Sequence, residues 1–361
     1  MSLSLVVDGE RWRSHLRACA DANPGLVPVL KGNGYGFGLG RLARKSDWLG
    51  VDTVAVGTYA ELGEVEKRFG GSLLVLTPWR PFGHSLAAVA DRTPDPRLIH
   101  TVSRVEDLVA LLGHDPSARF VLERMTSMLR HGLDASGLRE AVELLREHPR
   151  ARLEGVALHL PLAQGSHIGQ FERLMNDVVA AGLAPQGASD PARRTVWVSH
   201  LTPEELTTLR ARYADFRIRP RVGTALWLGD RGALRVEATV LDAHPVERGT
   251  LFGYRGRSTP RAGTLLVVSG GTAHGIGLEA PPGDQSLKAR AVTVARGGLD
   301  AAGLTRSPFS IDGKQRLFAE PPHMQASMLF LPSGSRVPAV GERVSVRVRY
   351  TTTSFDDVTL D

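Results

Sequence analysis

A lysine that follows a short apolar run is the residue whose setting most directly indicates chemistry. The apolar segment 27–30 is followed by Lys31 and then by the glycine-dense stretch Gly32-Asn33-Gly34-Tyr35-Gly36-Phe37-Gly38. A partly desolvated lysine has a lowered pKa and can form a Schiff base with an aldehyde, and a glycine-rich backbone can approach a ligand closely. The other interpretation of Lys31 is a surface lysine before a flexible turn.

The alternation of strand-like and helical segments predicts the scaffold that would position Lys31. Between about residues 27 and 222, short β-branched runs alternate with amphipathic stretches, as in a parallel sheet. About eight such units fit a closed (β/α)8 barrel of the TIM type better than an open doubly wound sheet, and Lys31 would then stand at the C-terminal end of the first strand, where such barrels carry out chemistry. The expected strands are Val27–Leu30, Thr53–Val56, Leu73–Leu76, Leu98–Val102, Arg119–Leu122, Leu153–Leu158, Thr195–Val198 and Phe216–Pro220. The expected helices between them are Gly40–Leu49, Tyr59–Phe69, His84–Ala90, Val105–Leu112, Gly137–His148, Gln170–Ala181 and Pro203–Tyr213.

The composition and periodicity of the sequence change after Trp227. Gly- and Pro-rich loops now separate strand-like segments with little helical periodicity, which predicts a mostly-β domain. We therefore expect a barrel over residues 11–228 and a C-terminal β domain over residues 229–361. The N-terminal segment 1–10 holds the expected strand Leu3–Val7, which should pack with the C-terminal domain; the helix Gly9–Ala22 follows it. The expected strands of the β domain are Val236–Leu241, Thr264–Val268, Ala289–Ala295, Met328–Leu331 and Arg343–Tyr350.

The composition excludes several classes of protein. The chain has 361 residues, a net charge of +6 and one cysteine, Cys19. One cysteine rules out a disulfide framework and a Cys-based zinc or iron–sulfur site, and it favours a reducing compartment, by default the cytoplasm. No apolar run approaches the ~18 residues of a membrane span, so no membrane association is expected. The arginines are dispersed along the chain, which is typical of a solvated surface and not of a nucleic-acid-binding protein.

Further polar residues follow the expected strands in order along the chain. They are Glu123 and Arg130, His159, Ser199 and His200, and then Arg221, Gly223 and Thr224. Together with the segment Leu30-Lys31-Gly32-Asn33-Gly34-Tyr35-Gly36, these motifs resemble the alanine racemase family, which consists of fold-type III pyridoxal-phosphate enzymes with an N-terminal barrel and a C-terminal β domain. The resemblance extends along essentially the whole chain. It implies pyridoxal 5′-phosphate as the cofactor, held covalently by Lys31, and a reaction that interconverts L- and D-amino acids.

The resemblance also implies the cofactor-binding residues. Arg130, in a segment similar to Asp-Thr-Gly-Met-x-Arg-x-Gly, would hydrogen-bond the phenolic oxygen of the cofactor and approach the substrate carboxylate. Glu123 stands where relatives often carry a carbamylated lysine and supplies the same negative charge. Arg221 would keep the pyridine nitrogen unprotonated, because an arginine does not give up its proton, and this favours racemisation over decarboxylation. The other implied cofactor contacts are Tyr35, His159, Ser199, His200, Gly223, Thr224 and Tyr350.

Racemisation requires an acid/base group on each face of the substrate Cα. In the family, the cofactor lysine serves one face and a tyrosine of the β domain, donated by the partner subunit, serves the other. The segment Val246-Glu247-Arg248-Gly249-Thr250-Leu251-Phe252-Gly253-Tyr254 resembles the segment that carries this tyrosine. Lys31 and Tyr254 are therefore the expected catalytic pair, and a homodimer with shared active sites is implied. On periodicity alone, Tyr254 would be an ordinary half-buried strand tyrosine.

Several positions expected to face the substrate depart from the family. Thr272 stands where relatives carry a tyrosine that narrows the entrance, and Gln325, next to Met324, stands for an aspartate. These changes open and neutralise the outer pocket, so the substrate need not be alanine. The tail over residues 351–361 is also shorter than usual. His274 and His323 have no cysteine beside them, and no metal is expected.

Two other functions remain open at this point. One is a related pyridoxal-phosphate-dependent lyase, decarboxylase or epimerase of a biosynthetic pathway, which product analysis would separate because racemisation keeps the carbon skeleton. The other is a non-catalytic pyridoxal-phosphate-binding protein. Carriers with this barrel generally lack the β domain, and a carrier would not depend on Tyr254.

Overall fold

The structure is a computed structural model that describes residues 2–90, 95–162, 165–183, 194–278 and 305–361. The chain forms two compact units: Arg13–Gly34 with Gly38–Gly229, and Met1–Trp12 with Tyr35–Phe37 and Asp230–Asp361. The fold class predicted from the sequence is confirmed, because a (β/α)8 barrel is followed by a mostly-β part of the chain.

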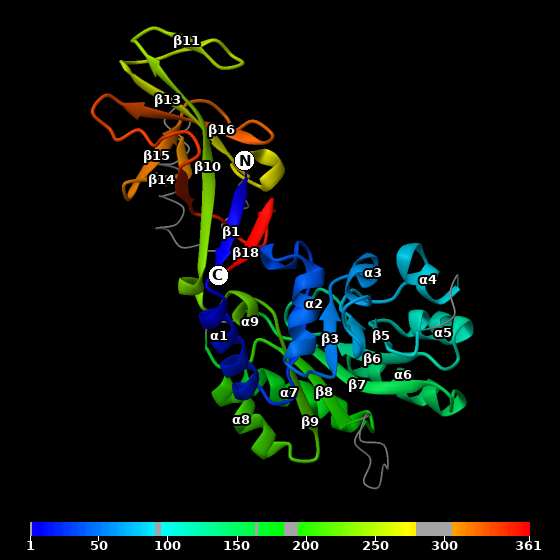
Figure 1. The fold of residues 1–361 in the computed structure, drawn as a ribbon. Helices are drawn as coiled ribbons and strands as arrows, with labels where there is room; N and C mark the ends of the chain where they lie inside the picture. The colour runs from blue at the N-terminus through cyan, green and yellow to red at the C-terminus, as the bar shows by residue number, and fades with distance from the viewer. Residues whose placement is uncertain (1, 91–94, 163–164, 184–193, 279–304) are drawn as a thin grey trace. The chain divides into compact units, whose positions relative to one another are not determined.

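Eight parallel strands close into the barrel of the first unit (Figure 1). The strands are β2 (Val27–Leu30), β3 (Thr53–Val56), β4 (Ser72–Val75), β5 (Leu98–Val102), β6 (Arg119–Arg124), β7 (Arg152–His159), β8 (Thr195–Ser199) and β9 (Arg217–Val222). Pairing of β2 with β9, in which Val27 is opposite Arg221, completes the closure. The α-helices of the described chain are α1 (Gly9–Ala22), α2 (Leu39–Trp48), α3 (Leu62–Val65), α4 (Gly83–Ala90), α5 (Val105–His114), α6 (Ala135–Glu147), α7 (Ile168–Ala180), α8 (Pro203–Arg212) and α9 (Thr224–Leu228).

Apolar side chains from the strands fill the barrel. The buried cluster consists of Val27, Val29, Ala55, Leu74, Ile99, Val121, Ala157 and Trp197. The indole Nε1–H of Trp197 donates to the carbonyl oxygen of Glu154 at 2.7 Å, so the one polar atom of this side chain is satisfied. A packed interior of this kind fixes the strands against one another and leaves their carboxyl ends as a rigid platform for loops.

The segment after β3 differs from the helix predicted over Tyr59–Phe69. A 3₁₀ turn at Tyr59–Glu61 leads into α3, which has only four residues. The Glu61 carboxylate accepts hydrogen bonds from the backbone N–H groups of Gly57 at 2.7 Å and Gly32 at 2.8 Å. These bonds hold the tight first turn against the loop that follows β2.

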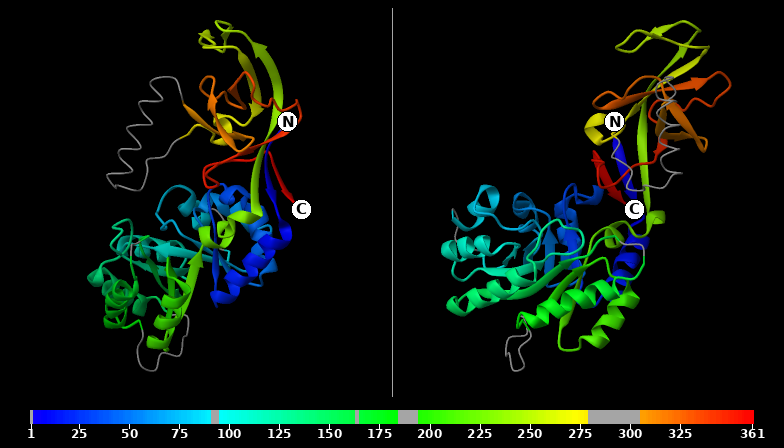
Figure 2. Two further views of the ribbon diagram at one scale, coloured as in Figure 1. Left: turned by 90° about the vertical axis from the view of Figure 1, so that its left-hand side faces the viewer. Right: turned by 180° about the vertical axis from the view of Figure 1, so that it is seen from behind.

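The second unit is built on an eight-stranded sheet in the order β13-β16-β15-β14-β17-β10-β1-β18. The long strand β10 runs beside β1 in an antiparallel pair, with Leu3 opposite Ala238, and β18 pairs in parallel on the other side of β1 (Figure 2). A separate hairpin joins β11 (Leu251–Phe252) to β12 (Arg257–Ser258). The strands of the sheet are β1 (Leu3–Val7), β10 (Leu234–Val246), β13 (Gly263–Ser269), β14 (Arg306–Ile311), β15 (Lys314–Phe318), β16 (Ala326–Pro332), β17 (Arg343–Val346) and β18 (Asp357–Leu360).

Some strands of this unit differ from the expectation. Strand β17 ends at Val346 and does not reach Tyr350, because the chain turns at Arg349, whose carbonyl oxygen accepts the N–H groups of Thr352 and Thr353. Strands β14, β15 and β18 were not expected from the sequence, and the expected strand Ala289–Ala295 lies outside the described residues. Among the helices of the described ranges, none has the length and apolar character needed to cross a bilayer.

Candidate active site

The carboxyl ends of the barrel strands bring together most of the residues predicted for the barrel. Lys31 follows β2, Arg130 lies in the loop after β6, His159 and Ser199 end β7 and β8, and Arg221 lies near the end of β9. In the strand ladders, His159 is opposite Ser199 and Ser199 is opposite Arg221. Parallel pairing therefore places these residues on one rim of the barrel.

Lys31 lies against the end of the neighbouring strand. A Cβ added to Gly57, the residue after β3, would lie 2.9 Å from the Cβ of Lys31, so a glycine is needed there. Part of the Lys31 side chain faces solvent, but desolvation of the rest lowers its pKa. The charges of Arg130 and Arg221 lower this pKa further, against the opposing effect of Glu61. The amine therefore loses its proton more readily than an ordinary lysine, as a nucleophilic amine must.

Arg221 is a buried cation with an unsatisfied donor. It is 6% exposed, its Nη2 donates to the carbonyl oxygen of Leu158 at 3.1 Å, and its Nε has no hydrogen-bond partner among the described residues. Burial lowers the pKa of Arg221 to about 10, although the charge of Glu123 raises it. Because buried donors are nearly always hydrogen-bonded, this Nε–H marks a place for an acceptor from outside the described chain.

Glu123 is the buried acid of the same cluster. It is 3% exposed, and its Oε2 has no hydrogen-bond partner within the described ranges. Burial raises the pKa of Glu123 to about 7, while the charges of Arg221, Arg130 and Arg80 oppose this rise. Near neutral pH the carboxyl group is therefore divided between its neutral and charged forms, and the charge of the cluster changes with it.

His159 contributes a neutral imidazole to this rim. Its Nδ1 lies 2.7 Å from Ser199 Oγ, and its ring centroid lies 5.2 Å from that of His200. Burial lowers the pKa of His159 to about 3, and the charges of Arg221 and Arg130 act in the same direction. The fixed charges are therefore mainly those of the arginines, which favours an anionic ligand.

Two loops at the barrel mouth have an unusual backbone. His200 has φ 67° and Leu129 has φ 51°, a region that residues other than glycine rarely adopt. The Nδ1–H of His200 donates to the carbonyl oxygen of Leu160 at 2.6 Å, which holds the strained residue in place. Burial lowers the pKa of His200. Gly223 and Thr224 open α9 after the last strand and are not buried.

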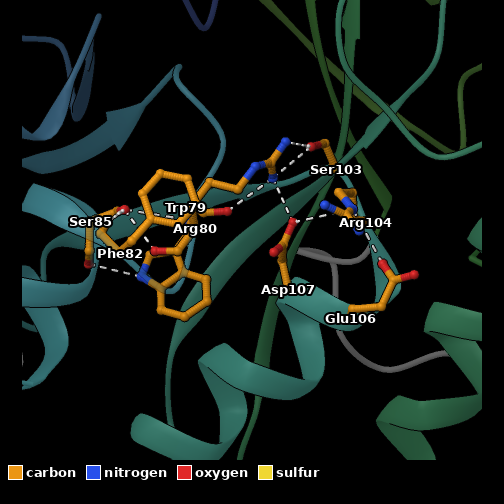
Figure 3. A network of polar contacts seen from close by, with 8 residues as sticks. All are labelled: Trp79, Arg80, Phe82, Ser85, Ser103, Arg104, Glu106 and Asp107. Atoms are coloured by element: carbon orange, nitrogen blue, oxygen red, sulfur yellow. Dashed lines mark hydrogen bonds and ion pairs between the residues drawn. The ribbon is translucent and has the colours of Figure 1, made fainter.

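Arg80 lies in the loop after β4, which carries no recognised motif, and Figure 3 shows its polar contacts. Its Nη1 donates to Asp107 Oδ2 at 2.6 Å and to Ser103 Oγ at 3.2 Å. Asp107 is 4% exposed, so the pair is largely shielded from solvent on the acid side. The charge of Arg80 lowers the pKa of Glu123, although less than the charges of Arg221 and Arg130 do.

In the second unit, the turn after β11 presents Tyr254. Tyr254 is 86% exposed, and its backbone N–H donates to Glu320 Oε2 at 3.1 Å. The phenol ring centroid lies 4.7 Å from that of His323. Met324 and Gln325 follow His323 in the loop between β15 and β16, and both are exposed. The structure therefore brings the predicted tyrosine base next to the loop of the predicted substrate-facing residues.

Three other predicted residues belong to this unit, namely Thr272, Tyr350 and Tyr35. The backbone N–H of Thr272 donates to the carbonyl oxygen of His323 at 2.8 Å. The Tyr350 ring centroid lies 4.8 Å from the guanidinium carbon of Arg231, and burial raises the pKa of Tyr350 while Arg231 lowers it. Tyr35 is 4% exposed with φ 56°.

His274 and His323, the two histidines weighed for a metal, pair with separate carboxylates. His274 Nε2 lies 3.1 Å from Asp356 Oδ1, and His323 Nε2 lies 2.6 Å from Glu320 Oε1. In the part of the chain that the structure describes, no three His, Cys, Asp or Glu residues are grouped to hold a metal ion.

Comparison with known proteins decides the family. The family model for the N-terminal domain of alanine racemase matches residues 10–193. The chain belongs to the alanine racemase family. The resemblance inferred from the motifs is therefore confirmed, and the matched range includes Lys31, Arg130 and His159.

The individual proteins that match are distant in sequence and similar in fold. An alanine racemase of Nitratidesulfovibrio vulgaris (strain DSM 19637 / Miyazaki F) is 27% identical over 266 residues, which is 70% of this chain and 70% of that protein. The crystal structure of alanine racemase from Bartonella henselae with covalently bound pyridoxal phosphate matches with a TM-score of 0.67 at 17% identity and covers 98% of both chains. A histidine racemase from Leuconostoc mesenteroides subsp. sake matches with a TM-score of 0.65 at 16% identity and covers 95% of this chain and 87% of its own.

The alanine racemase motifs did not reveal every polar residue at the barrel mouth or around Tyr254. Glu61 and Arg80 lie in loops after β3 and β4, and Glu320 lies after β15. The only sequence signal for Glu61 and Arg80 is weak: each is a charged residue a few positions beyond an expected barrel strand. Glu320 could have been found only from its spacing to His323, three residues later.

Proposed function

We propose that this member of the alanine racemase family is a pyridoxal-phosphate-dependent amino-acid racemase. The observation that carries the proposal is Lys31, an amine of lowered pKa at the carboxyl end of β2 with the charges of Arg130 and Arg221 acting on it. The relative from Nitratidesulfovibrio vulgaris is named alanine racemase, and the structure from Bartonella henselae holds pyridoxal phosphate covalently. Both support the same chemistry for this chain.

The residues at the barrel mouth fit pyridoxal 5′-phosphate. Lys31 offers the amine for a covalent link, and the unpartnered Nε–H of Arg221 offers a donor for the pyridine nitrogen. When bound, the cofactor supplies an electron sink for the charge left on the substrate Cα after proton removal. Arg221 stays protonated at neutral pH, so it would keep the pyridine nitrogen unprotonated and would favour racemisation.

The remaining contacts with the cofactor are proposed from the family resemblance. Arg130 would bind the phenolic oxygen and approach the substrate carboxylate, and Glu123, whose charge acts with that of Arg130 in the barrel mouth, would orient it. The backbone N–H groups of Gly223 and Thr224 would bind the phosphate. Further proposed contacts are Tyr35, His159, Ser199, His200 and Tyr350.

Lys31 and Tyr254 are proposed as the two bases, one for each face of Cα. Tyr254 would come from a second copy of the chain, so the working enzyme would be a homodimer with shared active sites. The 86% exposure of Tyr254 supports this role, because the phenol is available to another molecule. Within its own unit, Glu320 holds the backbone of Tyr254 and His323 contacts one side of the ring.

The proposed substrate is alanine or a larger or modified amino acid, and the product is its mirror image. Thr272, Met324 and Gln325 lie in one loop cluster and carry no charge, so this part of the site would not require a charged side chain. A fold shared with a histidine racemase is consistent with a substrate other than alanine. The single cysteine supports the cytoplasm as the proposed location.

The reaction is tested with the holoenzyme in deuterium oxide against a panel of L- and D-amino acids. We expect deuterium at Cα and appearance of the opposite enantiomer with the carbon skeleton intact, read by mass spectrometry and chiral separation. Loss of the carboxyl group would instead identify a decarboxylase. Cofactor uptake without any exchange at Cα would identify a non-catalytic carrier.

A further inference from the structure

Glu320 is a buried carboxylate with both oxygens engaged near Tyr254. It is 3% exposed. Its Oε1 lies 2.6 Å from His323 Nε2, and its Oε2 accepts the backbone N–H of Tyr254 at 3.1 Å. A buried carboxylate is costly to desolvate, so a satisfied one adjacent to an exposed phenol calls for an explanation.

The same carboxylate fixes the turn that carries Tyr254. Gly253 has φ 71°, and a Cβ added to it would lie 2.1 Å from Glu320 Oε2. A side chain at this position would therefore displace the carboxylate, and the positive φ also favours glycine. The Glu320 carboxylate therefore lies against Gly253 and accepts the N–H of Tyr254.

His323 connects Glu320 to the phenol ring. The centroids of the His323 and Tyr254 rings lie 4.7 Å apart, with their planes at 58°. Backbone hydrogen bonds hold the loop that carries His323. The N–H of His323 donates to the carbonyl oxygen of Ala326, and the carbonyl oxygen of His323 accepts the N–H of Thr272. The Nε2–H of His323 donates to the carboxylate, and this bond fixes the orientation of the ring.

We propose that Glu320 and His323 are positioning residues for Tyr254 as an acid/base. The carboxylate orients the imidazole, and the imidazole packs against the phenol ring and restricts its rotation. The phenolate arises when the Tyr254 Oη–H bond breaks, its electron pair stays on oxygen and the proton goes to the substrate Cα. The inference rests on the proposed function, because it requires Tyr254 to exchange a proton with Cα.

A second histidine and carboxylate pair in the same unit provides a matched control. His244 Nε2 lies 3.3 Å from Asp242 Oδ2, and both side chains are more than half exposed. Solvent screens such a pair, so its removal costs little. The pair of His323 and Glu320 differs in its shorter distance, its buried acid and its contact with Tyr254.

The test compares His323→Phe with His244→Phe in the holoenzyme. Phenylalanine keeps an aromatic ring against Tyr254 and removes only the hydrogen bond and the proton. Deuterium incorporation at Cα is followed separately from the L- and the D-enantiomer. We expect His323→Phe to slow exchange on the Tyr254 face on the order of tenfold in kcat, with KM, exchange on the other face and borohydride-fixed cofactor unchanged. His244→Phe should behave as the wild type.

The possible outcomes separate the inference from the proposed function. Equal slowing from both enantiomers, or no slowing in His323→Phe, overturns the positioning role while leaving the racemase proposal standing. A wild type that binds no cofactor or exchanges no Cα proton overturns the proposed function and this inference with it.

A second measurement does not depend on activity, because Glu320 is buried and its replacement disturbs the loop. In protein labelled with nitrogen-15 at histidine and free of substrate, the His323 Nε2–H proton should resonate downfield as a strongly hydrogen-bonded proton. The signal should be lost in Glu320→Gln and in His323→Phe and kept in His244→Phe. Absence of this signal from the wild type overturns the inference.

Discussion

Nδ1 of His159 lies 2.7 Å from Ser199 Oγ, and the two residues are directly opposite each other at the ends of β7 and β8. Burial, with the charges of Arg221 and Arg130, lowers the pKa of His159 to about 3. The imidazole is therefore a neutral hydrogen-bonding group at neutral pH and not a proton donor. Under the proposed function, proton transfer at the barrel mouth would therefore fall to Lys31, whose pKa burial lowers, and not to His159.

Glu123→Gln should stabilise the protein above neutral pH. Burial raises the pKa of Glu123 from 4.5 to about 7, so its contribution to stability is fully present below pH 4.5 and is lost as the pH rises through 7. Glutamine mimics the neutral acid at every pH. We expect the variant to gain up to about 3 kcal/mol at pH 8 and almost nothing at pH 4.5, measured by urea denaturation. A gain of the same size at both pH values would contradict the raised pKa of Glu123.

His100 should make the barrel sensitive to acid. It is 3% exposed, its Nδ1 lies 2.8 Å from the Tyr59 hydroxyl, and burial lowers its pKa from 6.5 to about 4. Its contribution to stability is therefore present above pH 6.5 and is lost as the pH falls towards 4. His100→Gln, which keeps an acceptor for the Tyr59 hydroxyl, should lose about 2 kcal/mol less than the wild type between pH 6.5 and 5, by urea denaturation. The exposed His84→Gln is the control, and an identical acid response of both variants would argue against this role.

Tyr254→Phe should slow proton exchange at Cα from one enantiomer by a factor on the order of a hundred or more, because it removes the proposed base of one face. Exchange from the other enantiomer and the amount of bound cofactor should stay near the wild-type values. The measurement is deuterium incorporation from each enantiomer, with Tyr213→Phe in the barrel unit as the control. Equal slowing from both enantiomers, or from neither, would rule out the two-base scheme.

The barrel and its strand ends could be predicted from the sequence because local signals agree there. Buried β-branched or leucine-rich runs alternate with helices, and Lys31, His159 and Ser199 directly follow or end such runs. Parallel strands present their carboxyl ends on one rim, so the strand pattern alone places these residues together. Their catalytic and binding roles remain predictions.

The features that escaped prediction depend on contacts between distant segments. Strand β14 contains Pro308, which weakens a strand signal, and it is stabilised by pairing with β15 and β17. The roles of Glu61 and Glu320 could not be predicted, because they depend on contacts with Gly32 and Gly253 that form only in the folded chain. Nothing in the one-dimensional pattern reports such pairings.

The central claim is tested most directly by fixing the cofactor to the protein. Purified protein is loaded with pyridoxal 5′-phosphate, reduced with borohydride and digested, and the modified peptide is identified by mass spectrometry. We predict that the adduct lies on Lys31, that Lys31→Ala loses both the adduct and the visible absorbance of bound cofactor, and that Lys67→Ala, at an exposed lysine of the same unit, loses neither. An adduct on another lysine, or one that persists in Lys31→Ala, would contradict the account.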